Sequence, residues 1–204
     1  MPYNTQRLFV VLAALVALLA GAGVSWWTQH STPYKTVAGT LWPVTPPLAA
    51  VTLTDHNGQV FDRARLRGRW TLFFFGYTHC PDICPSTLGM LNDVAQRLKG
   101  SPAGEQLQFV FVSVDPERDT VATLKSYLNY FNPHFIGLTG TPAAITALTQ
   151  QFSLPVARQG TGQDYQVDHS ATLILTNPDA RQYAVFSSPH QSALIAQDLM
   201  GLIQ

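Results

Sequence analysis

The sequence predicts an α/β fold, in which one sheet is flanked by helices and an apolar N-terminal helix precedes them. Short, nearly continuous apolar runs alternate along the chain with segments whose apolar residues recur at helical spacing. The chain then ends in a β-hairpin pattern followed by one more helical pattern. Strands that alternate with helices in this way are typical of α/β sheets.

An uncharged apolar segment opens the chain. No charged residue occurs from Leu8 to Gln29. Residues 8–27 predict a transmembrane anchor, because a helix of about 20 residues spans about 30 Å, the thickness of the hydrocarbon layer of a bilayer. Arg7 precedes this segment, so the positive-inside rule places residues 1–7 in the cytoplasm.

The far end of the apolar segment supports this orientation but leaves one alternative open. Trp26 and Trp27 stand where an aromatic belt would mark the second interface. The small residues Ala20-Gly21-Ala22 also fit the cleavage site of a secretory signal peptide. Under both interpretations the rest of the chain is exported. The apolar run is long for a signal peptide, whose apolar region has about 7–15 residues, and this favours the retained anchor. We therefore expect an inner-membrane protein with an extended linker over residues 28–46 and a periplasmic domain over residues 47–204.

The elements expected in residues 47–204 follow in chain order. A hairpin around Asn57-Gly58 comes first, and then a strand over 70–75 whose unbroken apolar run suits burial on both faces. A final hairpin turns at Asn177-Pro178-Asp179. The remaining helical patterns cover residues 88–98, 121–131, 142–152 and 192–203, and the remaining strand patterns cover 107–114, 135–138, 172–175 and 183–186.

Charge and cysteine content narrow the function. Lys plus Arg equal Asp plus Glu at 12 each, so the chain offers no basic excess for nucleic acid, and we expect no nucleic-acid partner. The chain has 2 cysteines, too few for a disulfide scaffold. Their closeness in sequence indicates a site instead.

The cysteines Cys80 and Cys84 lie in the pattern C-P-x-x-C-P, between the strand over 70–75 and the next helix. Ligands in open α/β sheets collect at the carboxyl ends of strands, which is where these cysteines are expected. A helix that begins at either Pro81 or Pro85 places both thiols near its N-terminus, and the helix dipole is expected to lower their pKa.

Thiols in this position can form a disulfide with each other or bind a soft metal. Thioredoxin-type redox motifs have the spacing C-x-x-C, whereas Cys80 and Cys84 have three residues between them. The wider spacing is tolerable for a disulfide and useful for a metal. Two sulfurs make an incomplete site for most metals, so a metal would require a third ligand elsewhere.

One histidine is a candidate for that third ligand. His169 lies in Asp168-His169-Ser170, at the start of an apolar strand, where a charged pair is costly to bury unless it is paired or bound to a metal. Imidazole suits copper and zinc. His79 precedes Cys80 and is interpreted as a surface residue. The other histidines are also expected at the surface: His30, His56, His134 and His190.

Four motifs occur in a fixed order: FFFGYTHCPDICP, VSVDPERDT, FIGLTGTP and VDHSATLIL. Together they resemble the Sco (SenC-like) copper-binding proteins over about residues 47–204, and the N-terminal anchor also fits that family. The resemblance implies a thioredoxin-like fold. It implies copper bound by Cys80, Cys84 and His169. Two thiolates and an imidazole suit Cu(I), and Cu(II) could be held with an added ligand.

The resemblance also implies a function and partners. Family members help deliver copper to the dinuclear copper centre of cytochrome c oxidase, and some are discussed as thiol–disulfide reductants. The implied partners are the copper-bearing subunit of the oxidase, a thioredoxin-like reductant and another copper carrier as donor. A thiol–disulfide oxidoreductase that uses Cys80 and Cys84 without His169 is the alternative function. A thiol peroxidase is a further reading, which needs an activated cysteine beside a cation.

Several neighbours have expected roles. Tyr77 and Phe75 are expected to wall the site, and Asp168 either orients His169 or is a surface carboxylate. Asp115 and Glu117 are expected to cap the following helix rather than to touch metal. The turn at 177–180 departs from the expected pattern, because Ala180 stands where a glycine is expected to end the turn.

Overall fold

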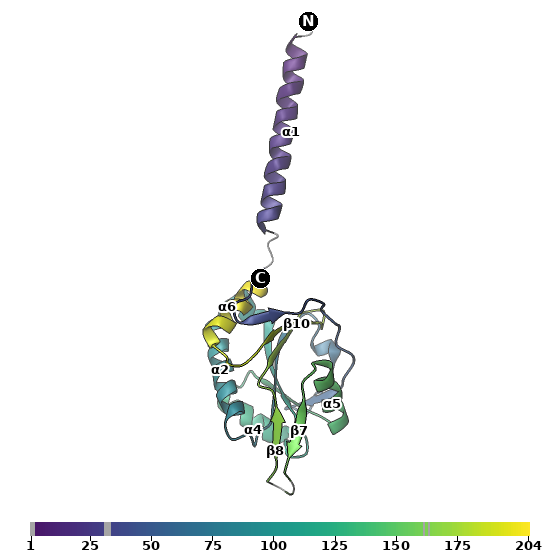
Figure 1. Cartoon of the computed structure of the whole chain (residues 1–204), viewed down its shortest axis with the longest axis vertical. Helices are drawn as coiled ribbons and strands as arrows, with labels where there is room; N and C mark the ends of the chain where they lie inside the picture. Colours follow the sequence, from purple (N-terminus) through teal and green to yellow (C-terminus); the bar gives the residue numbers. More distant parts are fainter. Residues whose placement is uncertain (1–2, 31–33, 161, 163) are drawn as a thin grey trace. The chain divides into compact units, whose positions relative to one another are not determined.

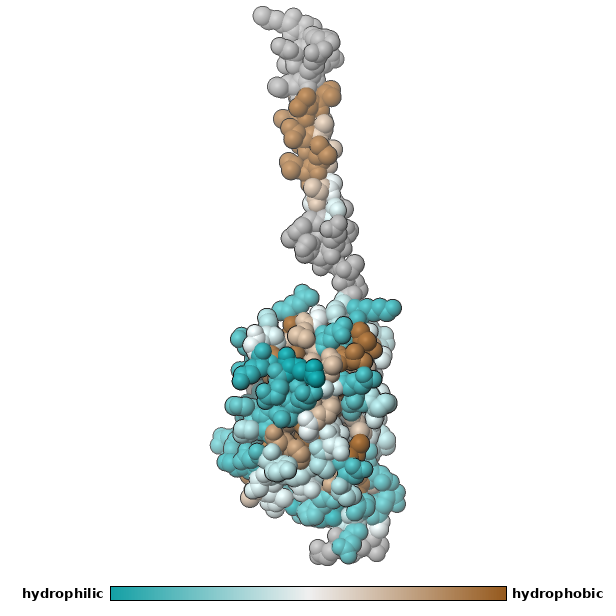
Figure 2. Space-filling view, turned by 90° about the vertical axis from the view of Figure 1, so that its left-hand side faces the viewer, coloured by the Kyte–Doolittle hydropathy of each residue, from teal (hydrophilic) through white to brown (hydrophobic). Residues whose placement is uncertain are grey.

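The computed structural model describes residues 3–30, 34–160, 162 and 164–204. The chain divides into two compact units, Met1–Lys35 and Thr36–Gln204. The first unit contains helix α1 (Tyr3–His30), whose described apolar side chains from Phe9 to Leu19 are exposed and form the brown stretch in Figure 2.

Within the part of the chain that the structure describes, no helix combines the length and the hydropathy needed to cross a membrane. The anchor over residues 8–27 therefore stays a prediction. The side chains of Trp26, Trp27 and His30, with their expected interface and surface positions, lie outside the described residues.

The second unit is a mixed α/β domain whose described residues form an eight-stranded sheet in the order β1-β10-β9-β4-β5-β6-β2-β3 (Figure 1). The central strands β4, β5 and β6 are parallel, and the flanking pairs are antiparallel. A separate antiparallel hairpin consists of β7 and β8. The strands are β1 (Gly39–Leu41), β2 (Leu53–Asp55), β3 (Val60–Phe61), β4 (Trp70–Gly76), β5 (Leu107–Ser113), β6 (Ile136–Thr139), β7 (Val156–Gln159), β8 (Gln166–His169), β9 (Leu173–Thr176) and β10 (Gln182–Phe186).

Helices cover both faces of this sheet, with α2, α4 and α6 on one side and α5 on the other (Figure 1). Their starts follow from local sequence: Thr120 caps α4 by accepting from Thr123 N–H at 3.1 Å, and Thr141 caps α5 ahead of Pro142. The helices are α2 (Ile83–Leu98), α3 (Pro102–Gln106), α4 (Val121–Phe131), α5 (Pro142–Gln151) and α6 (Ser192–Leu202), with a 3₁₀ turn at Arg63–Arg65.

The core lies on both faces of β4, as its unbroken apolar run predicts. Side chains alternate across a strand, so Phe73 and Phe75 share one face, and both contact Phe152, with ring centroids 5.5 and 5.6 Å away. Phe74 points to the opposite face and contacts Phe111 at 5.7 Å. Because β4 is packed on both faces, its C-terminal end and the start of the loop that carries Cys80 are held in place.

The predicted hairpins, the buried strand and the later helices are confirmed, but the expected linker is partly wrong. Residues 39–41, within the segment 28–46, form β1 and pair with β10. The buried Asp198 carboxylate accepts hydrogen bonds at 2.8 Å from three successive backbone N–H groups, those of Val37, Ala38 and Gly39. This contact orders residues that look like a tether by composition.

The turn between β9 and β10 explains the unexpected alanine. Ala180 takes a φ of 56°, the left-handed conformation that glycine normally supplies. Asn177 Oδ1 accepts from the backbone N–H groups of Asp179 at 3.2 Å and Arg181 at 3.0 Å, and these bonds hold the turn. The Asn side chain therefore stabilises a turn that lacks the expected glycine.

Replacing Asp198 by Asn should destabilise the protein. The amide keeps the shape, but its NH₂ group faces donors, and hydrogen bonds to a charged group are worth about 1.5–3 kcal/mol each. We expect a loss of about 2 kcal/mol or more, which lowers the melting temperature by about 4–8 °C. Thermal unfolding followed by circular dichroism measures this. The exposed control Asp179→Asn should stay within about 0.5 kcal/mol of wild type. If Asp198→Asn has the melting temperature of the wild type, the pairing of β1 with β10 is sufficient to hold residues 37–41.

Candidate metal centre

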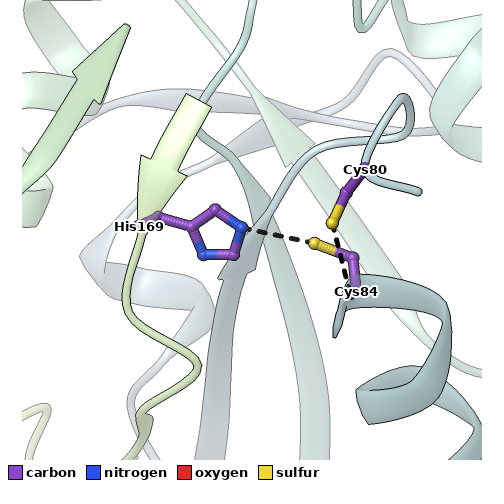
Figure 3. A group of neighbouring side chains, drawn as sticks. All are labelled: Cys80, Cys84 and His169. Carbon is purple, nitrogen blue, oxygen red and sulfur yellow. Dashed lines mark hydrogen bonds between the residues drawn. The ribbon is translucent and has the colours of Figure 1, made fainter. Parts of the chain in front are cut away.

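The three predicted ligands come from two separate parts of the fold (Figure 3). Cys80 lies in the loop after β4, and Cys84 lies in the first turn of α2. His169 is the last residue of β8. Neither predicted helix start is right, because α2 begins at Ile83. Cys84 is therefore helical and Cys80 is outside the helix.

The structure brings these three side chains together. Their ligand atoms, the two sulfurs and one imidazole nitrogen, all lie within 4.8 Å of one another. Cys84 Sγ is 3.3 Å from His169 Nε2, and the backbone N–H of Cys84 donates to Cys80 Sγ at 3.4 Å. Both cysteines are free thiols and buried, while His169 is half-buried. Two soft sulfurs and one imidazole form a donor set that suits copper.

A glycine makes the close approach of Cys84 to the sheet possible. Gly76 is the last residue of β4, and a Cβ atom added to it would lie 2.9 Å from Cys84 Sγ and 2.8 Å from Phe111 Cε2. The Gly76 carbonyl accepts from Val114 N–H at 2.8 Å, which keeps the ends of β4 and β5 in register. The absent side chain leaves the volume that the sulfur occupies.

The orientation of His169 leaves one nitrogen directed at the sulfurs. His169 Nδ1 lies 3.2 Å from the carbonyl oxygen of Ser170 and donates to it. Nε2 then carries the lone pair and faces Cys84. Metal-bound histidines commonly donate their other N–H in this way. Asp168 is exposed, so of its two expected roles the structure favours the surface carboxylate.

Burial, rather than the helix dipole, controls the protonation of the site. Burial raises the pKa of the Cys84 thiol, so the predicted lowering by the helix N-terminus is wrong for this residue in the metal-free protein. Burial also lowers the pKa of His169, against smaller raising effects of the Ser170 carbonyl and Asp168. The metal-free pair of Cys84 and His169 is thus neutral near pH 7.

Aromatic rings wall the site, though not all the expected ones. Tyr77 stands edge-on to His169, with ring centroids 5.8 Å apart, as predicted. Phe74 also meets the His169 ring, at 6.4 Å. Phe75 does not wall the site, because strand alternation turns it to the opposite face of the sheet, against Phe73 and Phe152.

The surface positions expected for the other histidines are confirmed for two of the four that the structure describes. His79 and His134 are exposed, and His190 is half-buried with Nε2 donating to Ala171 O at 2.7 Å. His56 was expected at the surface but is buried, because its Nδ1 accepts from Gly137 N–H at 2.9 Å beside β6. Among the described residues these four histidines lie outside the Cys80, Cys84 and His169 group.

The segment VDPERDT has a different role from the expected one. Thr120, not Asp115 or Glu117, caps α4. Asp115 pairs with Arg118, and Glu117 pairs with Arg158. Sequence reasoning missed Asp119, a fully buried carboxylate that binds the loop before Cys80. The sequence did contain a signal for Asp119. It is a charged residue in the motif VSVDPERDT, and the sequence analysis gave it no role.

Comparison with known proteins identifies the family. The family described as SCO1/SenC matches residues 48–204. This chain belongs to the SCO1/SenC family. Protein SCO2 homolog, mitochondrial, from Bos taurus is 42% identical over 129 residues, which is 62% of this chain and 48% of that protein. The chain therefore spans about half the length of that relative.

Solved structures of Sco proteins share the fold. Apo Sco1 from Thermus thermophilus is 32% identical with a TM-score of 0.74, over 82% of this chain and 97% of that one. ScoI from Bradyrhizobium japonicum, solved with copper bound, is 38% identical with a TM-score of 0.68, over 75% of this chain and 97% of that one. The mixed α/β, thioredoxin-like fold and copper as the metal of the family are thus shown.

Replacing Gly76 by Ala should displace Cys84. The new Cβ cannot fit at 2.9 Å from Cys84 Sγ, so the sulfur or the end of β4 must shift. We expect weaker Cu(I) binding and a loss of stability of about 1–3 kcal/mol, as for other overpacked cores. Chelator competition and urea unfolding measure the two effects. Gly89→Ala is the matched control, since Gly89 faces open space within α2 and alanine there should stabilise by about 0.5–1 kcal/mol. Unchanged Cu(I) affinity in Gly76→Ala would contradict the account.

Acid should destabilise the metal-free protein through His169. The pKa of His169 is lowered in the folded state. As the pH falls below about 6.5, the imidazole is therefore protonated in the unfolded chain before it is protonated in the folded protein. Stability that is present above this pH is lost as the pH falls towards the folded pKa, and the loss then levels off. Urea unfolding of the reduced protein between about pH 5 and 8 should show this slope, and His169→Ala should flatten it. His134→Ala, at an exposed site, should leave the slope unchanged. Equal slopes in wild type and His169→Ala would contradict the prediction.

Proposed function

We propose that Cys80 Sγ, Cys84 Sγ and His169 Nε2 bind one copper ion, and that the protein is a copper chaperone. The observation that carries this proposal is the convergence of the three ligand atoms within 4.8 Å, from a loop, a helix and a separate hairpin. Two thiolates and an imidazole suit Cu(I), and an added ligand would allow Cu(II). Copper binding displaces the proton of Cys84, since the thiolate is the metal ligand.

The recipient that fits best is the dinuclear copper centre in the copper-bearing subunit of cytochrome c oxidase, which Sco proteins help to load. A separate copper carrier would supply the ion. We propose that α1 tethers the domain to the inner membrane with the domain in the periplasm. The exposed apolar side chains of α1 from Phe9 to Leu19 support attachment to a membrane.

An oxidising compartment adds a requirement for a reductant. The sulfurs of Cys80 and Cys84 lie within 4.8 Å of each other, so the pair is placed to close into a disulfide, which cannot bind Cu(I). A thioredoxin-like partner would then return both thiols before loading. The same proximity favours the second candidate function, a thiol–disulfide oxidoreductase acting on cysteines of a copper protein.

Copper binding and His169 separate the two functions. The reduced protein, loaded anaerobically, should hold about one copper per chain, and His169→Ala should weaken Cu(I) binding by about tenfold or more. Elemental analysis and competition with a chromogenic Cu(I) chelator measure this, with His134→Ala as the control. Transfer of copper to the metal-free copper subunit of the oxidase should likewise be reduced in His169→Ala and unchanged in His134→Ala. If His169→Ala binds Cu(I) as tightly as the wild type, and the Cys80–Cys84 disulfide is readily reduced and reformed, the oxidoreductase function would be favoured instead.

A further inference from the structure

The loop of residues 115–119 lies between β5 and α4, and it contacts both parts of the fold that supply the copper ligands. One part is the cysteine loop after β4, and the other is the β7–β8 hairpin that ends in His169. Neither contact involves a ligand atom, so the loop acts on the site from outside it.

Asp119 binds the cysteine loop. Its side chain is fully buried, and Oδ2 accepts from the backbone N–H of Thr78 at 3.0 Å and from Ser113 Oγ at 2.7 Å. Oδ1 accepts from Thr78 Oγ1 at 2.6 Å. Ser113 ends β5, and Thr78 stands two residues before Cys80. The carboxylate therefore joins the cysteine loop to the end of the neighbouring strand.

Asp115 and Arg118 bind the hairpin through Tyr165. The Tyr165 hydroxyl donates to Asp115 Oδ1 at 2.5 Å, and Arg118 Nη1 donates to the Tyr165 carbonyl at 3.1 Å. Arg118 Cζ lies 3.6 Å from the centroid of the Tyr165 ring, and the guanidinium forms an ion pair with Asp115. Tyr165 precedes β8 directly and is buried. Both ends of this residue are thus held by the loop.

The hairpin depends on such contacts for its position. The strands β7 and β8 pair with each other in a two-stranded sheet, apart from the eight-stranded one. An isolated two-stranded hairpin is marginally stable at best, so packing must fix it. Every residue of β7 is exposed, whereas Tyr165 and Val167 on the β8 side are buried. The buried side of the hairpin is the side that the loop contacts.

We propose that the loop of residues 115–119 sets the separation between the thiols and the imidazole, with Asp119 positioning the cysteine pair and Arg118 positioning His169. This inference rests on the proposed copper site. It assigns separable effects to two neighbouring residues: Arg118 governs the hairpin and copper affinity, and Asp119 governs the cysteine pair in both its copper and its disulfide chemistry. Both are positioning residues, since neither touches the metal ligands' donor atoms.

The hairpin side is tested with Arg118→Gln in the full chain. We expect Cu(I) affinity to fall by about tenfold or more, as for other residues that support metal ligands. Amide hydrogen exchange across β7 and β8 should accelerate. The Cys80–Cys84 disulfide equilibrium against dithiothreitol should shift less than in Asp119→Asn, because Arg118 meets the cysteine loop at the Tyr77 ring, with Cζ 5.6 Å from its centroid, rather than through a buried carboxylate.

The matched control is Arg97→Gln, because the exposed Arg97 side chain forms an ion pair with Asp93 on the same helix. It should retain wild-type Cu(I) affinity. Arg158→Gln removes a second contact between the hairpin and the loop, since Arg158 stacks on the Tyr165 ring, with Cζ 3.4 Å from its centroid, and pairs with Glu117. Arg158 is more exposed than Arg118, so its loss should weaken Cu(I) binding less.

Equal weakening by Arg118→Gln and Arg97→Gln, or normal Cu(I) affinity in Arg118→Gln, would overturn the proposal. If Arg118→Gln does not fold, Tyr165→Phe, which removes only the hydroxyl bonded to Asp115, should give the same pattern with a smaller effect.

The cysteine side is tested with Asp119→Asn, which places an amide donor against the Thr78 and Ser113 donors. We expect lower Cu(I) affinity and a change of about tenfold, or about 30 mV, in the disulfide equilibrium, with hairpin exchange unchanged. Thr78→Val, which removes one bond to Asp119, should shift the same two quantities less. An unchanged disulfide equilibrium in Asp119→Asn would overturn this half.

Failure of the proposed function is distinguishable from failure of this inference. A wild-type chain that binds no Cu(I) would defeat the copper chaperone. The hairpin exchange of Arg118→Gln and the disulfide equilibrium of Asp119→Asn are measured without copper, so they still decide whether the loop positions the two parts.

Discussion

The metal centre depends on the close contact between the end of β4 and the first turn of α2. Gly76 has no side chain, so the sulfur of Cys84 and the ring of Phe111 can approach to 2.9 and 2.8 Å from the position that a Cβ would take. This contact buries the thiol at the carboxyl end of a central strand, where ligands of open sheets collect. Because the apolar faces of β4 are packed on both sides, the strand cannot rotate to relieve the contact. The packing of the core therefore holds the sulfur of Cys84 in place.

Burial also determines the chemical state of the empty site. An exposed thiol at a helix N-terminus would ionise readily, whereas the Cys84 thiol is kept protonated by desolvation. The same desolvation keeps His169 neutral, and its Nδ1–H bond to Ser170 leaves Nε2 able to accept from Cys84. The metal-free site is therefore an uncharged pair that avoids two buried charges. A cation that enters would replace the proton of Cys84, which would couple copper loading to proton release.

Much of this arrangement could be predicted from sequence, and the failures have physical causes. The buried strand, the hairpins and the three converging side chains follow from apolar patterns and motifs. The pKa of Cys84 was mispredicted because a dipole argument omits burial depth, which a sequence does not contain. Phe75 was wrongly predicted to line the site because the face of the sheet to which it points depends on the alternation of side chains along β4. Strand β1 was missed because a residue distant in sequence, Asp198, orders it through its carboxylate. Long-range polar contacts leave no periodic signal.

The ligands are divided between a rigidly packed core element and a separate hairpin, and this division bears on the proposed copper transfer. A chaperone must hold copper firmly and still release it, and a site built on one rigid element could open only by unfolding. Here two ligands follow a core strand, while the third sits on a two-stranded hairpin whose outer strand is exposed. Under the proposed function, movement of the hairpin would withdraw His169 and leave Cys80 and Cys84 for an incoming partner to share. The contacts of Arg118 and Asp115 with Tyr165 would resist that movement, together with the burial of Tyr165 and Val167 against the core. Under the proposed function, copper retention and copper release would thus be adjusted at the hairpin, away from the buried contact that keeps Cys84 in place.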